Sequence, residues 1–203
     1  MLILGTQSEV RFDAENHRYW LGPRELKSVS AVIRTVYSPK SWDGVDPDVV
    51  DRARVRGEAV DKYLSAYIAN GNVVVPYGES DDVKERFEIA ARLWDKAYPN
   101  GIAVQVQPIV YSEEDGIAGT ADFIVDGETV VDLKNTYRPE HSWKLQIGAY
   151  SAYSGARNAR VLHVSPKVHP GGGVWLPYNV VDCKAIWQDA VKWYKRTLEM
   201  EHA

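Results

Sequence analysis

The stretch from Gly119 to Tyr150, GTADFIVDGETVVDLKNTYRPEHSWKLQIGAY, constrains the fold more than any other part of the chain. Asp126-Gly127 stands between two apolar runs, and this dipeptide favours a tight turn that folds one strand back on the other. Asp122 comes early in the first strand and Asp132 comes late in the second. We therefore expect both carboxylates at the same end of a β-hairpin.

Alternation of side chains along the second strand adds a third polar group. Asp132 and Lys134 are two residues apart and should share a face, while Leu133 should point the other way. Two carboxylates beside one ammonium form an oxygen-rich site that suits Mg²⁺ or Mn²⁺. Taken alone, the same pattern is also that of a strand-end salt bridge.

The order of the motifs carries more information than any one of them. G-T-x-D, then D-x-K about ten residues later, then a helix bearing Q-x-x-x-Y, resembles the PD-(D/E)XK nuclease superfamily. The match is closest to its RecB-like, Cas4-like and phage exonuclease branch. The resemblance implies an α/β (α+β) fold with a restriction-endonuclease-like core, in which helices flank a central mixed β-sheet.

Composition is that of a folded globule. The chain has 203 residues, of which 45% are hydrophobic, and we predict one nuclease-like domain over 1–203. The single cysteine, Cys183, excludes an intramolecular disulfide and a cysteine-cluster metal site. Some Cas4-like relatives carry such a cluster, and this chain differs from them.

No signal peptide and no membrane-spanning segment is visible in the sequence, so we expect a cytoplasmic protein, bacterial or, for a phage protein, in the host cytoplasm. The net charge of −4 argues against nonspecific coating of duplex DNA. It does not exclude a nuclease, because phosphate contacts depend on local patches.

Local signals predict most of the elements. Capping residues and apolar periodicity indicate helices that start after Ser28, at Pro47, after Ser80, at Pro139 and after Asp182. We expect a loop over Ser38–Gly44 in which Trp42 is packed. Strands are expected around a turn within 11–21, as one strand over 102–111, and over 159–165 and 174–180.

The helix that begins at Pro47 contains a second acidic pair. Arg56-Gly57 and the residues after it resemble the R-G-x-x-x-H helix of the RecB-like branch, with Asp61 at the place of the histidine. Glu58 and Asp61 are neighbours on one helix face, so they are either further metal ligands or a solvated acidic face. Gly57 costs about 1 kcal/mol relative to alanine, which suggests close approach by another backbone or by DNA.

One departure from the family pattern concerns the strand before G-T-x-D, where relatives often carry a glutamate. This chain has Gln105 and Gln107 there, followed by Pro108. Glutamine offers a carbonyl oxygen but no charge. The departure puts that ligand, and a strong second metal site, in doubt.

The resemblance implies a metal-dependent DNA nuclease that hydrolyses phosphodiester bonds, with an exonuclease acting on DNA ends in recombination, repair or phage DNA metabolism as the favoured form. A structure-selective or sequence-specific endonuclease is left open. Mg²⁺ is the expected cofactor, and Mn²⁺ is able to replace it. The expected partner is DNA with an end or a single-stranded region, and no membrane. A homo-oligomer or a recombination or replication protein is left open.

The site residues that follow from this resemblance fall into three groups. The expected catalytic residues are Asp122, Asp132, Lys134, Gln146 and Tyr150. The expected metal ligands are Asp122, Asp132 and the Leu133 backbone carbonyl, with Glu58 and Asp61 as further candidates. The expected DNA contacts are Arg56, Tyr137, Arg138 and Lys144.

The alternative is a nuclease fold with weak or no activity that binds DNA or a protein partner. Gln107 and the acidic balance favour it. The presence of Asp132 and Lys134 argues against it, because buried charges without a role are costly.

Overall fold

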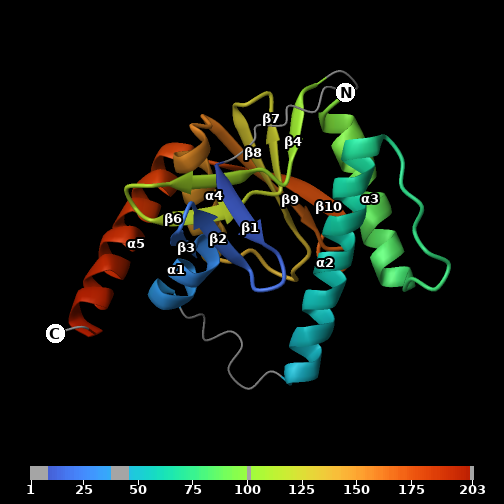
Figure 1. Ribbon diagram of the computed structural model, residues 1–203. Coiled ribbons are helices and arrows are strands. Elements are labelled where there is room, and N and C mark those ends of the chain that lie inside the picture. Colours follow the sequence, from blue (N-terminus) through green and yellow to red (C-terminus); the bar gives the residue numbers. More distant parts are fainter. Residues whose placement is uncertain (1–8, 38–45, 100–101, 202–203) are drawn as a thin grey trace.

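The computed structural model describes residues 9–37, 46–99 and 102–201, which form ten strands and five helices (Figure 1). The expected loop with Trp42 lies outside these residues. One sheet has the order β1-β2-β3-β6-β5 and the other the order β10-β9-β8-β7-β4. The first comprises β1 (Val10–Asp13), β2 (Arg18–Leu21), β3 (Arg24–Ser28), β5 (Ile109–Ser112) and β6 (Ile117–Thr120). The second comprises β4 (Val104–Val106), β7 (Phe123–Val125), β8 (Thr129–Lys134), β9 (Asn158–Val164) and β10 (Gly173–Tyr178).

Both sheets are mixed, since β3 pairs with β6 and β8 pairs with β9 in parallel, while the other pairs are antiparallel. The expected mixed α+β class is therefore confirmed. The expected central sheet is divided into two. The chain passes between them once through α1–α3, from β3 to β4, and twice directly from strand to strand.

The predicted single strand over 102–111 is wrong for this reason. It is two strands, β4 and β5, in different sheets, separated by Gln107 and Pro108. Gln107 has a φ of 50°, in the left-handed region, and Pro108 has no N–H to continue a ladder. The second crossing, between β6 and β7, lies at Ala121 and Asp122.

Hydrogen bonds join the two crossings to each other. The Gln107 N–H donates to the Asp122 carbonyl at 2.8 Å, and the Ala121 N–H donates to the Pro108 carbonyl at 3.0 Å. Backbone hydrogen bonds therefore hold Asp122 at the seam, the place where the chain passes from one sheet to the other.

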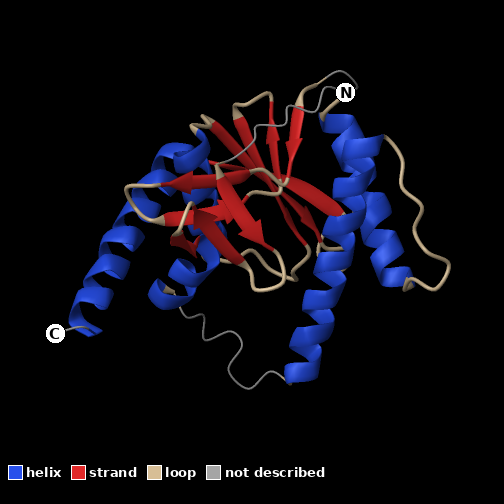
Figure 2. Ribbon diagram, viewed as in Figure 1, coloured by secondary structure: helices blue, strands red, loops and turns tan. Residues whose placement is uncertain are grey.

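Helices cover both faces of the β4–β10 sheet (Figure 2). On one face lie α2 (Pro47–Asn70) and α3 (Asp81–Ala97), which pack with Val131 and Leu133. On the other lie α1 (Val29–Val36), α4 (Ser142–Ser154) and α5 (Val180–Glu201), which pack with Val130. Neighbouring residues of β8 thus enter opposite cores, as strand alternation requires.

Capping explains where most helices begin. Ser28, Asp46 and Ser80 accept hydrogen bonds from backbone N–H groups of the first turns of α1, α2 and α3, as predicted. The predicted Asp182 cap is wrong, because α5 begins at Val180 and the Asn179 side chain accepts from the Val181 N–H at 3.0 Å. Helix α4 starts at Ser142, after Pro139 rather than with it. None of the described helices combines the length and apolar character needed to cross a membrane.

Candidate active site

The β7–β8 turn determines which side chains meet. Asp126 and Gly127 have φ values of 52° and 69°, and the Glu128 N–H donates to the Val125 carbonyl at 3.0 Å. Val125 pairs with Thr129, so the connection contains three residues, one more than the predicted Asp126-Gly127 turn. Phe123 pairs with Val131, so the same register sets Asp122 across from Asp132. The Leu133 N–H donates to Asp122 Oδ2 at 2.6 Å. The predicted convergence of the two carboxylates is therefore confirmed.

Lys134 and Asp132 form a buried ion pair on the predicted common face of β8. Lys134 Nζ lies 2.7 Å from Asp132 Oδ2, and the two side chains are 17% and 2% exposed. Burial alone would lower the pKa of Lys134, but the negative charges of Asp132 and Asp122 outweigh it, and the pKa is raised. The ammonium is therefore charged at neutral pH.

Three carboxyl groups repel one another around this ammonium. Burial is the main cause that raises the pKa of Asp122 well above its ordinary value, and the charges of Asp132 and Asp61 add to it. Burial also raises the pKa of Asp61; a hydrogen bond from Gln107 opposes this effect and the charge of Asp132 reinforces it. The site therefore favours a bound proton or cation over three bare anions.

Helix α2 contributes one of the two predicted acids to this cluster. Asp61 Oδ2 accepts from Gln107 Nε2 at 3.0 Å, and Asp61 Oδ1 is buried without a hydrogen-bond partner. Glu58 differs, because its side chain is 63% exposed and pairs with Arg54 at 2.7 Å. The structure brings Asp61 to the carboxylates and leaves Glu58 at the pocket mouth. The role of either residue as a metal ligand stays a prediction.

Gln107 is a site residue whose function the sequence left undecided. Its backbone forms the seam and its side chain holds Asp61, while Gln105 lies within β4. A non-glycine residue with positive φ is uncommon and is enriched at functional sites. The only signal in the sequence was Gln107 followed by Pro108, a pair that marks a break in a strand.

Tyr150 and Gln146 of α4 lie behind the carboxylates. Tyr150 is buried, and burial first, then the charges of Asp132 and Asp122, raises its pKa well above the ordinary value, although a hydrogen bond with Gln146 opposes the shift. Tyr150 therefore remains protonated at neutral pH. A Cβ on Gly119 would lie 2.9 Å from Tyr150 Cε1, so the glycine of G-T-x-D leaves room for this ring.

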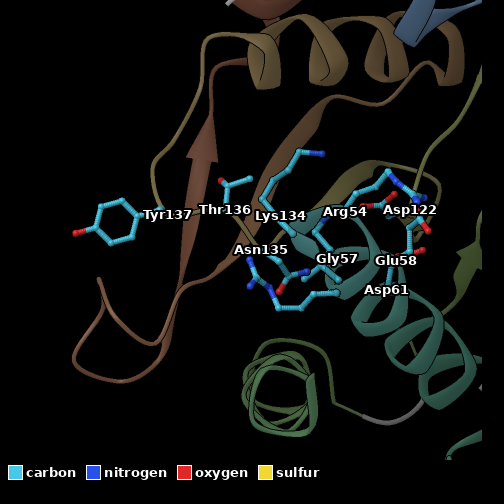
Figure 3. Close-up of a pocket in the computed structure, with 12 residues that line it drawn as sticks. Arg54, Gly57, Glu58, Asp61, Asp122, Lys134, Asn135, Thr136 and Tyr137 are labelled. Carbon is cyan, nitrogen blue, oxygen red and sulfur yellow. Dashed lines mark hydrogen bonds and ion pairs between the residues drawn. The ribbon is translucent and has the colours of Figure 1, made fainter. Parts of the chain in front are cut away.

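A pocket of about 460 Å³ opens beside the carboxylates, between α2 and the loop after β8 (Figure 3). Of the predicted DNA contacts, Arg56 and Tyr137 line it, and the Arg138 guanidinium lies 5.7 Å from the centre of the Tyr137 ring. Lys144 is exposed on α4, where its charge acts on Cys183 of α5, and it does not line the pocket. The lining residues are Ala53, Arg54, Arg56, Gly57, Glu58, Asp61, Asp122, Leu133, Lys134, Asn135, Thr136 and Tyr137.

His163 holds the loop after β8, which lines the pocket, and no pattern in the sequence indicated this role. It is fully buried in β9, and its Nε2 donates to the Thr136 carbonyl at 2.8 Å, because a carbonyl can only accept. Its Nδ1 therefore accepts from His169 Nε2 at 3.0 Å. Burial lowers the pKa of His163. Nothing local marks this residue, since its partners belong to other segments.

Unsatisfied oxygens indicate what the acidic cluster could bind. Within 9–37, 46–99 and 102–201, no three His, Cys, Asp or Glu side chains form a group close enough to hold a metal ion. However, Asp61 Oδ1 is buried without a hydrogen bond of ordinary geometry, and Asp132 Oδ2 is buried with the Lys134 ammonium, 2.7 Å away, as its partner. Buried carboxylate oxygens of this kind fit a divalent cation. The metal ligands predicted from the sequence beside these oxygens are Asp122, Asp132 and the Leu133 carbonyl.

The solved structures that this chain resembles include exonucleases. LHK-Exo in complex with dAMP is 12% identical, with a TM-score of 0.51 over 87% of this chain and 89% of that one. A second structure of LHK-Exo, an alkaline exonuclease from Laribacter hongkongensis, has a TM-score of 0.48 at 12% identity over 86% and 88%. A phage-related exonuclease from Haemophilus somnus has a TM-score of 0.43 at 13% identity over 88% and 96%.

No protein-family model matches the sequence, and no curated protein matches it significantly. The likeness to LHK-Exo therefore concerns the fold. The chain has the fold of LHK-Exo, and the resemblance seen in the motifs is confirmed at the level of the fold.

Proposed function

We propose that this protein is a Mg²⁺-dependent deoxyribonuclease that hydrolyses phosphodiester bonds at DNA ends. The observation that carries the proposal is the convergence of Asp122, Asp132 and Lys134 at one hairpin end beside an open pocket. Two carboxylates with a charged lysine suit the hydrolysis of an anionic phosphodiester, and the exonuclease fold supports this reading.

Each side chain has a definite part in this proposal. Asp122 and Asp132, with the Leu133 carbonyl, would hold Mg²⁺ or Mn²⁺, and Asp61 is the nearest further acid. A bound divalent cation supplies Lewis-acid neutralisation of the phosphate charge. The Lys134 ammonium orients the attacking water and stabilises the negative charge that develops on the phosphate oxygens. Tyr150 stays protonated and acts as a hydrogen-bond donor rather than as a base.

The test compares the wild type with Lys134→Ala and Lys134→Gln on end-labelled linear duplex and closed circular DNA, with and without Mg²⁺. We expect cleavage of the linear DNA alone, and a loss of about 100-fold or more in the variants. DNA binding in Ca²⁺ should persist. Lys192→Ala, which removes an exposed lysine of α5, is the matched charge control.

Stability must be measured in parallel, because Asp132 is buried. Removing Lys134 leaves a buried carboxylate without its partner, at a cost of about 3–5 kcal/mol. Rates are therefore compared well below the melting temperature of the least stable variant. Equal rates in wild type and folded variants would contradict the proposed mechanism. DNA binding without cleavage by any of them would favour the binding module.

A further inference from the structure

Gly57 occupies a position in α2 where glycine has no structural reason within the described protein. It lies in the interior of the Pro47–Asn70 helix, where glycine costs about 1 kcal/mol relative to alanine. A Cβ placed on Gly57 meets no atom of the described residues within 4 Å. Close approach by another part of the described backbone, one of the two explanations considered from the sequence, is thereby excluded.

The open space beside Gly57 belongs to the pocket of the candidate active site. Gly57 lines this pocket together with Asp122 and Lys134 (Figure 3). A side chain at this position would project from α2 into the volume in front of the carboxylates. The space that glycine leaves is therefore available to a ligand, whereas the glycines that pack tightly elsewhere, such as Gly119, leave none.

Two polar residues, Arg56 and Asn135, line the same pocket. Arg56 Nε and Asn135 Oδ1 are buried and make no hydrogen bond, although the end of the Arg56 guanidinium contacts Asp82 at 3.2 Å. Both atoms are enclosed by the protein, so a ligand in the pocket would meet the exposed parts of these two side chains rather than these atoms. The pocket therefore presents two polar side chains beside the helix backbone at Gly57.

We propose that one strand of the substrate DNA lies directly against the backbone of α2 at Gly57. The positive charge of Arg56 and the polar side chain of Asn135, which both line the pocket, lie beside the path of this strand, and the arginine attracts its phosphates. The pocket volume of about 460 Å³ suits a small number of nucleotides rather than a length of duplex. This contact rests on the proposed nuclease function and specifies how its substrate approaches the carboxylates.

The test uses Gly57→Ala and Gly57→Leu, with Val55→Ala as the matched control. Alanine and leucine are better helix formers than glycine, so neither variant should lower the melting temperature. Val55 is half-exposed on the same helix and does not line the pocket. If a strand lies against Gly57, the dissociation constant for DNA should rise severalfold in Gly57→Ala and about tenfold or more in Gly57→Leu.

Binding is measured by fluorescence anisotropy of an end-labelled duplex in Ca²⁺, and KM by cleavage in Mg²⁺. Weaker binding together with an equal or higher melting temperature supports the contact, because a merely structural effect would move both in the same direction. Unchanged binding in both Gly57 variants of an active protein would overturn the contact alone. A wild type that neither binds nor cuts DNA would overturn the proposed function and the contact with it.

Discussion

Divalent cations should stabilise this protein against heat, and Asp122→Asn should remove most of that effect. Asp122, Asp132 and Asp61 repel one another, so an ion held among them relieves a cost that the unfolded chain does not bear. At a concentration 100 times Kd, a ligand specific for the folded state contributes about 2.7 kcal/mol. For a chain of this length, 1 kcal/mol corresponds to about 2–4 °C, so the melting temperature should rise by about 5–10 °C.

Without divalent cations, Asp122→Asn should not lower the melting temperature relative to the wild type. The folded state raises the pKa of Asp122, chiefly by burial, so its ionisation opposes folding. That cost appears above the ordinary pKa of the unfolded chain and is fully present once the pH exceeds the raised value. Asparagine removes the charge and keeps an oxygen for the Leu133 N–H. In EDTA at pH 8, Asp122→Asn should therefore melt no lower than the wild type.

Calorimetry or dye-monitored melting in EDTA, Mg²⁺, Mn²⁺ and Ca²⁺ at matched ionic strength measures both effects. Asp189→Asn, which alters an exposed carboxylate of α5, is the control and should retain the full cation shift. An equal shift in Asp122→Asn and the wild type would show that the ion binds elsewhere. No shift in the wild type with any cation would refute the metal site as drawn.

Three further outcomes are expected. Asp61→Asn should lower the cleavage rate by about tenfold or more, while Glu58→Gln should change it little, because Asp61 is buried near Asp122 and Asp132 and Glu58 is exposed. Equal rate losses in the two variants would contradict this. Burial lowers the pKa of His163, so the unfolded chain binds a proton at this residue more readily than the folded one. Urea titrations should therefore show the free energy of unfolding falling as the pH drops below about 6.5, and His163→Gln should flatten this slope. An unchanged slope would exclude His163 as its source. Arg86→Leu should lower the free energy of unfolding by about 1–3 kcal/mol, because the buried Val164 carbonyl loses its donor at 3.0 Å, and a cost within measurement error would indicate that water replaces it.

Local chemistry made the hairpin and its acidic end predictable. The Asp126-Gly127 signal predicts the hairpin, and strand alternation then assigns Asp132 and Lys134 to the same face, whatever surrounds them. The register itself was not predicted, because the connection also includes Glu128 and pairs Val125 with Thr129. The caps at Ser28, Asp46 and Ser80 are local in the same sense, because side chain and backbone lie within a few residues. Asp182 shows the limit of this reasoning, since the helix begins earlier and Asn179 accepts from the Val181 and Asp182 N–H groups.

The tertiary structure decided which distant groups join the site. The spacing of Glu58 and Asp61 places them on one face of the helix. The packing of α2 nevertheless buries Asp61 beside Gln107 and leaves Glu58 exposed, paired with Arg54. The left-handed turn at Gln107, which divides the sheet in two, is held by bonds to the strand crossing at Asp122. His163 reaches the loop after β8 only because β9 lies beside β8. Contacts between segments far apart in the chain depend on how whole elements pack, and no local pattern of residues records that packing.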